Sequence, residues 1–145
     1  MALMLDVNFF IAIIAATIVS FVIGGLWYGP LFGKAWMAAM GKTEADREAM
    51  RKQAPKGFVV ALVGAFIASF VLGILLQYAR LANVGLPAGV VGGLALGFLV
   101  WFGFPLTGMI TGAIFEGASG KLVGINLGHA LVTFLAMGLV LGIWV

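Results

Sequence analysis

The stretch VNFFIAIIAATIVSFVIGGLWYGPLFG, residues 7–33, contains no Asp, Glu, Lys or Arg. Roughly 20 apolar residues in a helix cross about 30 Å of hydrocarbon, so this run is long enough to span a membrane. Three further runs without these four residue types, at 57–79, 81–115 and 122–145, also exceed that length. The sequence therefore predicts an all-α fold, an integral membrane bundle of four transmembrane helices.

The composition supports a membrane protein and argues against several kinds of chemistry. Of the 145 residues, 63% are hydrophobic and 9% are charged, and the mean hydropathy is +1.20. One small core does not hide so much apolar surface, so lipid must cover the rest. The chain has no cysteine and one histidine, which excludes thiol chemistry and a multi-histidine metal site within one chain. We expect no catalytic residue, no metal and no cofactor.

We expect a single domain over residues 1–145, whose helices are separated by segments with charged residues. A cytosolic loop of residues 30–56 separates the first two of its helices, which are expected at 7–29, 57–79, 88–115 and 121–144. Within the loop, FGKAWMAAMG favours one interfacial turn. Thr43 then predicts the N-cap of a short amphipathic helix that ends before Pro55.

Lysine and arginine predict the orientation in the membrane. Seven of the eight lie in the loops that follow the first and third helices, and Arg80 alone lies on the other side. Because basic loops stay in the cytosol, both termini are expected to face outward across a bacterial inner membrane. The net charge of +3 then indicates contact with anionic membrane lipid and not with nucleic acid.

Small residues recur at four-residue spacing in every expected helix, and such stripes let helix backbones approach closely. Two interpretations stay open: all the stripes pack inside one protomer, or some join subunits of an oligomer. The stripes are Ala12, Ala16, Ser20 and Gly24; Ala61, Ala65, Ser69 and Gly73; Gly89, Gly93 and Gly97; Gly124 with Gly128; and Gly138 with Gly142.

The third helix is expected to bend at Pro105, within WFGFPLTG at 101–108. Pro105 has no N–H to donate to the carbonyl of Trp101. Thr107 and Thr111 are positioned to bond the freed backbone groups. Either the bend is structural, or the broken helix forms a ligand site.

His129 is the most informative polar residue, because ionisable groups inside a membrane are costly. Counted from the cytosolic ends, its Cα lies about 13 Å deep and that of Pro105 about 15 Å deep. Thr17, Ser20, Ser69 and Thr107 fall near this level, and Asn126 lies one turn shallower on the face of His129. His129 ties helices together, handles a proton or ligand, or binds a metal that bridges subunits. The candidate proton or ligand site also includes Asn126, Thr107, Thr111, Pro105 and Trp101. Glu116 is expected to pair with Lys121 at the interface, the alternative being a catalytic acid.

Three segments in this order resemble one protein family. WYGPLFGKAWM at 27–37, the pair Phe115-Glu116 and KLVGINLGHALV at 121–132 are similar to bacterial membrane proteins catalogued as domain of unknown function 1761. The resemblance covers nearly the whole chain and implies no substrate or reaction. It marks as family-pattern positions Trp27, Tyr28, Pro30, Phe32, Trp36, Glu116, Asn126 and His129.

The sequence favours a structural or accessory subunit, either a homo-oligomer or part of a membrane complex, that packs through its small-residue stripes. The alternative is a small transporter or channel that uses His129 and the break at Pro105. An enzyme is disfavoured because Glu116 and His129 differ in depth by about 13 Å along their helices, too far for a direct acid–base pair.

Overall fold

The computed structural model describes residues 5–144, so residues 1–4 and 145 of the expected domain lie outside the described part. Every regular element between residues 5 and 144 is helical, which confirms the all-α prediction. Four stretches of this part are long and apolar enough to cross a membrane, as predicted. The elements are α1 (Val7–Leu26), the π-helix η1 (Trp27–Leu31), α2 (Gly33–Ala39), α3 (Glu44–Leu81), α4 (Gly89–Gly103), α5 (Pro105–Glu116) and α6 (Gly120–Trp144).

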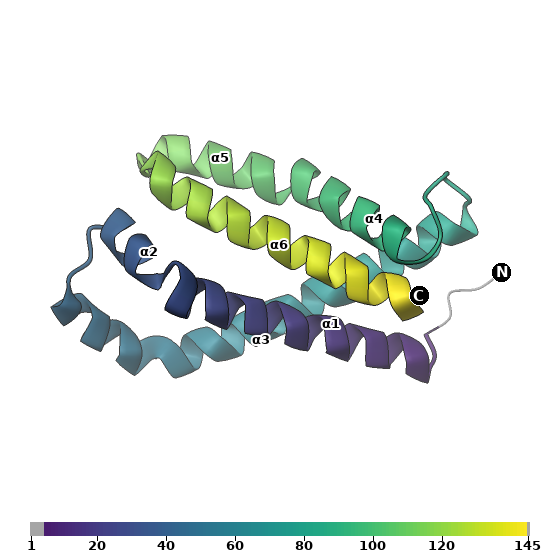
Figure 1. Ribbon diagram of the computed structural model, residues 1–145, viewed down its shortest axis with the longest axis horizontal. Helices are drawn as coiled ribbons and strands as arrows, with labels where there is room; N and C mark the ends of the chain where they lie inside the picture. The colour runs from purple at the N-terminus through teal and green to yellow at the C-terminus, as the bar shows by residue number, and fades with distance from the viewer. Residues whose placement is uncertain (1–4, 145) are drawn as a thin grey trace.

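The bundle is elongated (Figure 1), and the sequence gives its two ends different charges. At one end lie α2, the start of α3 and the turn between α5 and α6. At the other end lie the start of α1, the end of α6 and the α3–α4 connection. Seven of the eight basic residues belong to the segments of the first end, which we call the basic end, and Arg80 belongs to the opposite end. The predicted orientation places this basic end in the cytosol.

Helix α3 differs from the prediction, because it runs unbroken for 38 residues. Thr43 is its N-cap and forms a capping box with Asp46. The expected end before Pro55 was wrong, and most of the segment 30–56 between the first two spans is helical. Pro55 removes one hydrogen bond, the one to the carbonyl of Arg51. Both residues are exposed, so water can bond that carbonyl, and the strong helix formers around Pro55 keep the helix continuous.

The end of α1 is reshaped by Gly29 and Pro30. Gly29 has non-helical angles (φ −101°, ψ −106°), and the N–H of Phe32 donates to the carbonyl of Trp27 at 2.8 Å, which widens the turn into a π-helix. Gly33 starts α2 directly against Tyr28, because a Cβ there would lie 2.6 Å from the Tyr28 carbonyl oxygen. The expected interfacial turn is thus a short helix whose position depends on a glycine.

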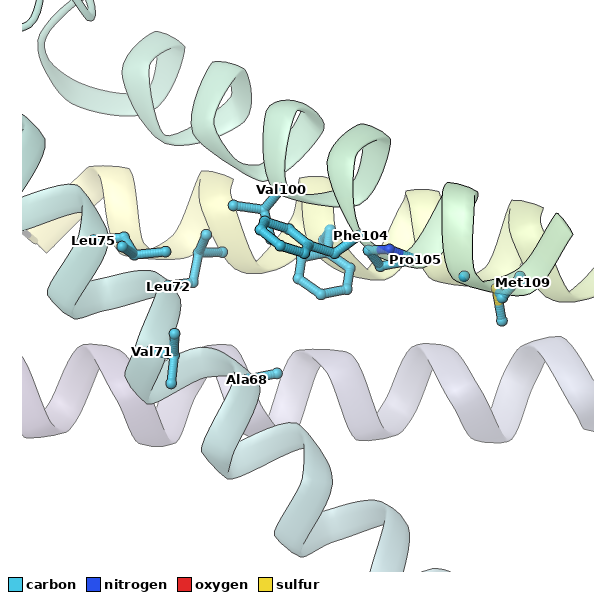
Figure 2. Close-up of a pocket in the computed structure, with 10 residues that line it drawn as sticks. Ala68, Val71, Leu72, Leu75, Val100, Phe104, Pro105 and Met109 are labelled. Atoms are coloured by element: carbon cyan, nitrogen blue, oxygen red, sulfur yellow. The ribbon is translucent and has the colours of Figure 1, made fainter. Parts of the chain in front are cut away.

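The predicted break at Pro105 is confirmed. The backbone of Phe104 is distorted from ideal helical angles (φ −118°, ψ −68°) between α4 and α5, and Pro105 begins α5. The Thr107 hydroxyl donates to the carbonyl of Gly103 at 2.8 Å and lies 3.1 Å from that of Phe104. Figure 2 shows Phe104 and Pro105 on the side of this helix that faces α3, with Leu72 and Leu75 opposite.

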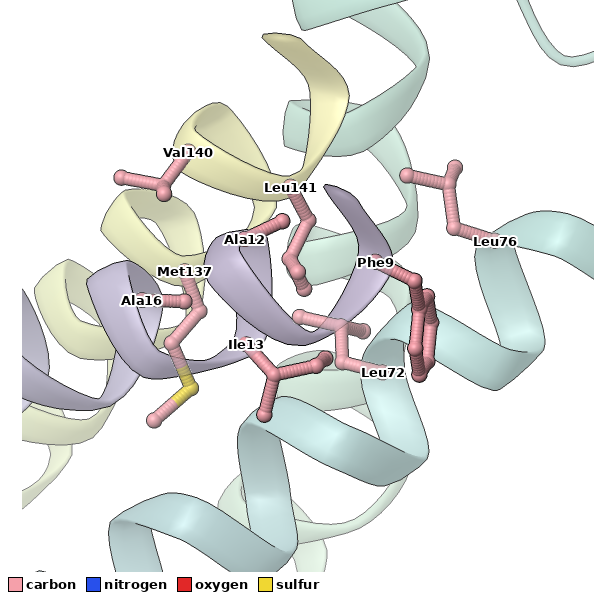
Figure 3. Close-up of a cluster of buried hydrophobic side chains, with 9 residues drawn as sticks. All are labelled: Phe9, Ala12, Ile13, Ala16, Leu72, Leu76, Met137, Val140 and Leu141. Atoms are coloured by element: carbon pink, nitrogen blue, oxygen red, sulfur yellow. The ribbon is translucent and has the colours of Figure 1, made fainter. Parts of the chain in front are cut away.

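The apolar core lies where α1, α3 and α6 cross, toward the end away from the basic residues (Figure 3). Ile13 of α1, Leu72 and Leu76 of α3, and Met137 and Leu141 of α6 are all fully buried. Gly73 makes room for α1, because a Cβ there would lie 2.7 Å from Ile13 Cδ1. The small-residue stripe of the first helix and the second half of that on α3 therefore pack inside the protomer.

A glycine seam joins α4 to α6. Cβ atoms built on Gly93 and Gly97 would collide with the backbone carbonyls of Gly138 and Phe134. In the other direction, a Cβ on Gly142 would lie 2.7 Å from the Gly89 carbonyl oxygen. The stripe on the third predicted helix therefore packs inside the protomer and does not join subunits.

Candidate functional site

Two aromatic side chains of η1, directly after α1, reach across to α6. The indole Nε1–H of Trp27 donates to the carbonyl of Ile125 at 3.0 Å. The hydroxyl of Tyr28 donates to Oδ1 of Asn126 at 2.9 Å. We call Trp27, Tyr28, Asn126 and His129 the aromatic clasp, because they fasten α1 to α6 near the basic end.

His129 lies half-buried beneath the two rings of the clasp. Its imidazole centroid is 4.8 Å from that of Tyr28 and 6.1 Å from that of Trp27. Within its own helix, Thr133 Oγ1 lies 3.4 Å from Nε2 of His129. Gly24 of α1 leaves space for this nitrogen, because a Cβ there would come within 3.4 Å of it. The histidine is therefore held by aromatic packing and one weak hydrogen bond.

The remaining family-pattern aromatics support the clasp from the side of α2. Trp36 packs edge-on against Tyr28 at 5.2 Å, and Phe32 lies 4.5 Å from Trp27 between ring centroids. Gly128 permits the approach of the indole, since a Cβ there would lie 3.0 Å from Trp27 Cζ2. The bend at Pro30 brings these rings together, so six of the eight family-pattern positions form one cluster.

The sequence did not predict this meeting, because Trp27 and Tyr28 lie at the end of the first expected span, 7–29, whereas the Cα of His129 was expected about 13 Å inside the membrane. Those depths refer to Cα positions. A side chain on a helix leans toward that helix's N-terminus. Because α1 and α6 are antiparallel, the rings of α1 and the imidazole of α6 lean toward one another. The direction in which helical side chains lean is therefore the signal from which the contact of Trp27 and Tyr28 with His129 could have been predicted.

The structure separates the other expected members of the site from His129. Trp101 of α4 also contacts α6, but its Nε1–H donates to the carbonyl of Leu127 at 3.3 Å, and Leu127 lies about 160° around the helix from His129. Pro105 faces α3. Thr107 bonds its own backbone, and Thr111 is exposed and forms no side-chain hydrogen bond within residues 5–144. Of the expected neighbours, Asn126 alone belongs to the clasp.

Pro105 and Phe104 line an apolar lateral groove of about 640 Å³ between α3, the α4–α5 break and α6. The residues drawn in Figure 2 form its walls, with Ala68, Val71 and Leu75 on α3. No polar side chain lines it. The bend in the third predicted helix therefore shapes a surface for apolar groups and not a polar ligand site.

Glu116 lies at the end of α5 and lines a pocket of about 290 Å³ that Asn126 also lines. The expected ion pair with Lys121 was wrong, because Arg47 with Glu44 is the single ion pair among the described residues. Gly117, in the left-handed conformation (φ 65°), ends α5 directly after Glu116 and turns the chain toward α6. Asn126 thus connects this pocket to the clasp.

The hydroxyl side chains expected near the depth of His129 are only partly buried together. Thr17, Ser20 and Ser69 are buried, whereas Thr107 is exposed. The Thr17 hydroxyl donates to the carbonyl of Ile13 at 2.7 Å, within its own helix. Ser69 Oγ has no hydrogen-bond partner in the described part of the chain. Within residues 5–144, no hydrogen bond connects these hydroxyls to His129.

Comparison with known proteins gives one match. The model of a family described as a protein of unknown function (DUF1761) matches residues 11–142. No curated protein and no solved structure matches the chain. The matched range includes the whole aromatic clasp, the π-helix and the break at Pro105. Because the match covers nearly the entire chain, this four-helix membrane protein belongs to the DUF1761 family.

Proposed function

We propose that the protein is a non-enzymatic assembly subunit of a bacterial inner membrane, with its basic end in the cytosol. In this proposal it associates with a second copy of itself through α3. The observation that carries the proposal is an open face of small residues on α3, beside the lateral groove.

This open face consists of Gly57, Ala61, Gly64 and Ala68, which share one side of the helix at 100° per residue. A Cβ on Gly57 or Gly64 would meet nothing within 4 Å, and Ala61 is exposed. Ala68 begins the wall of the groove, and Val71 and Leu75 continue it on the same side. A partner helix can approach the α3 backbone along this whole length.

A second copy is the partner that this geometry favours. In a two-fold dimer the same patch faces itself, so a stripe of small residues on one α3 meets the same stripe on the other. The seam between α4 and α6 shows that the chain already packs helices through glycine. Membrane helices associate through such packing because lipid removes the hydrophobic driving force between them.

The arrangement of the titratable groups supports a role without catalysis. His129 packs under Trp27 and Tyr28, whereas Glu116 lines a different pocket. Among the described residues the two form neither a hydrogen bond nor an ion pair. The hydrogen bonds of Trp27 and Tyr28 join η1 to α6, which favours the structural role among those left open for His129 and its neighbours.

Cysteine cross-linking in native membranes tests this proposal, because the natural chain contains no cysteine. Ala61→Cys places a thiol on the open face, and Val22→Cys places one on the exposed lipid side of α1. We expect oxidation to give a disulfide dimer with Ala61→Cys and none with Val22→Cys. Equal dimer formation, or none with Ala61→Cys, would contradict association through α3.

Transport is the second candidate, and one observation favours it. The pocket beside Glu116 reaches Asn126, which bonds Tyr28 above His129, so polar groups continue from the basic end toward the middle of the bundle. A proton carrier needs an ionisable histidine. Flux across reconstituted vesicles that His129→Gln abolishes, while the variant stays folded, would support transport. We expect no flux in either protein.

A further inference from the structure

A second groove, of about 720 Å³, lies at the basic end between α2 and the first part of α3. Its apolar lining comes from both helices and includes Trp36, Met37, Met50 and Phe58. Tyr28 of the clasp also lines it. This groove is separate from the lateral groove at Pro105. Apart from Tyr28 and Gly57, its lining residues belong to neither the clasp nor the open face of α3.

The charged residues of this groove are mostly basic. Lys34, Lys42, Arg47 and Arg51 line it, together with one acidic residue, Glu44. Glu44 is paired with Arg47 at 3.4 Å, which leaves three cations without an ion-pair partner among the described residues. Basic side chains arranged in this way attract an anion, and Arg51 adds a guanidinium suited to phosphate.

Charge and apolar surface are separated along the length of the groove. Arg51 lies above the point where the uncharged run of α3 begins, and Phe58 lies just inside that run. The two residues are seven positions apart, or about 10 Å along the helix axis. One occupant must therefore place an anionic group near the lysines and arginines and a hydrocarbon group beside the aromatic and methionine side chains.

From this arrangement we infer that the groove binds an anionic glycerophospholipid. The lipid phosphate lies among Lys34, Lys42 and Arg51, and an acyl chain runs past Trp36 toward Phe58. Basic pockets next to transmembrane helices bind lipid headgroups by the same combination of charge and apolar contact. Because Tyr28 lines the groove and also bonds Asn126, the bound lipid contacts the clasp that joins α1 to α6.

Native mass spectrometry of the purified full chain tests the inference, with phosphatidylglycerol and phosphatidylcholine as the probes. The variant Lys42→Gln/Arg51→Gln removes two groove charges. Its matched control, Lys52→Gln/Lys56→Gln, removes two charges of the same helix that do not line the groove. Circular dichroism checks that each variant keeps its helical content.

We expect the wild type to retain phosphatidylglycerol in preference to phosphatidylcholine. The groove variant should bind phosphatidylglycerol about 25-fold more weakly, because each basic residue near an anionic lipid contributes roughly a factor of five. The control should stay within about threefold of the wild type, since exposed charges outside the groove act weakly.

Three results would overturn the inference. Equal weakening in the two double variants would mean that net charge, and not the groove, attracts the lipid. Equal retention of the two lipids by the wild type would remove the anionic preference. Displacement of phosphatidylglycerol by glycerol phosphate at equal concentration would show that the site recognises a free phosphate without acyl chains. None of these results depends on whether α3 forms a dimer.

Discussion

Glycines occupy opposite environments on the two sides of this bundle. On α4, a Cβ on Gly93 would collide with the carbonyl of Gly138, whereas on α3 a Cβ on Gly64 would meet nothing within 4 Å. Both residues belong to helices with small residues at regular spacing. The difference teaches that such spacing indicates where a close approach is possible. It does not indicate whether the approaching helix comes from the same protomer.

The largest effect on stability is expected from adding a methyl group to the glycine seam between α4 and α6. Gly93→Ala places a methyl group against backbone, which cannot move aside like a side chain, so it should lower the unfolding free energy by about 3 kcal/mol or more. Its control, Gly25→Ala, adds a methyl group that meets nothing within 4 Å and should change that free energy by less than about 1 kcal/mol, in the stabilising direction, because alanine favours the helix. Denaturant titration in mixed micelles measures both. A small effect of Gly93→Ala would mean that α4 and α6 do not touch as described.

The aromatic clasp also contacts α6, and removing one of its hydrogen bonds is expected to have an intermediate effect on stability. Tyr28→Phe removes the bond to Asn126 and should cost about 1 kcal/mol, as is typical between membrane helices. Tyr78→Phe, at an exposed tyrosine near the other end, is the control and should be neutral.

A double-mutant cycle with Asn126→Leu isolates this bond. Since the two side chains bond each other, the double variant should be less destabilised than the sum of the single variants, by roughly 0.6–1 kcal/mol. Strict additivity would show that Tyr28 and Asn126 act independently.

The smallest effect is expected at Ser69, which lies in the core between the two regions. Its hydroxyl is buried without a partner in the described part of the chain, so Ser69→Ala should leave stability unchanged or raise it by up to about 1 kcal/mol. Thr17→Val is the comparison, because it removes a hydroxyl that is bonded to Ile13 and should destabilise slightly. Clear destabilisation by Ser69→Ala would reveal a partner for this hydroxyl.

The sequence predicted the helices and the break at Pro105 because both follow from local rules. Hydrophobic run lengths define membrane spans, and a proline inside a long apolar run interrupts the hydrogen bonds of its helix. Pro55 shows the limit of the second rule. The carbonyl of Arg51, which Pro55 leaves without a helical hydrogen bond, lies at the exposed start of α3 and not in an apolar run. Proline therefore did not end the helix at this position.

The candidate site was predicted only in part, because its members meet across different helices. Asn126 and His129 share one face of α6, which the spacing indicated. Their partners Trp27 and Tyr28 lie 98 residues from the groups that they bond, and their contact depends on the π-helix and on the room left by Gly24 and Gly128. Local spacing carries no information about such a long-range contact.

Subunit counting tests the proposed assembly role most directly. The wild type, Gly64→Leu and Gly25→Leu would be labelled with one fluorophore per chain and extracted into polymer nanodiscs from native membranes. A Cβ on either glycine would meet nothing within 4 Å in its own protomer, but Gly64 lies on the open face of α3 and Gly25 lies on α1. We predict two photobleaching steps for the wild type and for Gly25→Leu, and one step for a folded Gly64→Leu. A single step for the wild type, or two steps for Gly64→Leu, would contradict assembly through α3.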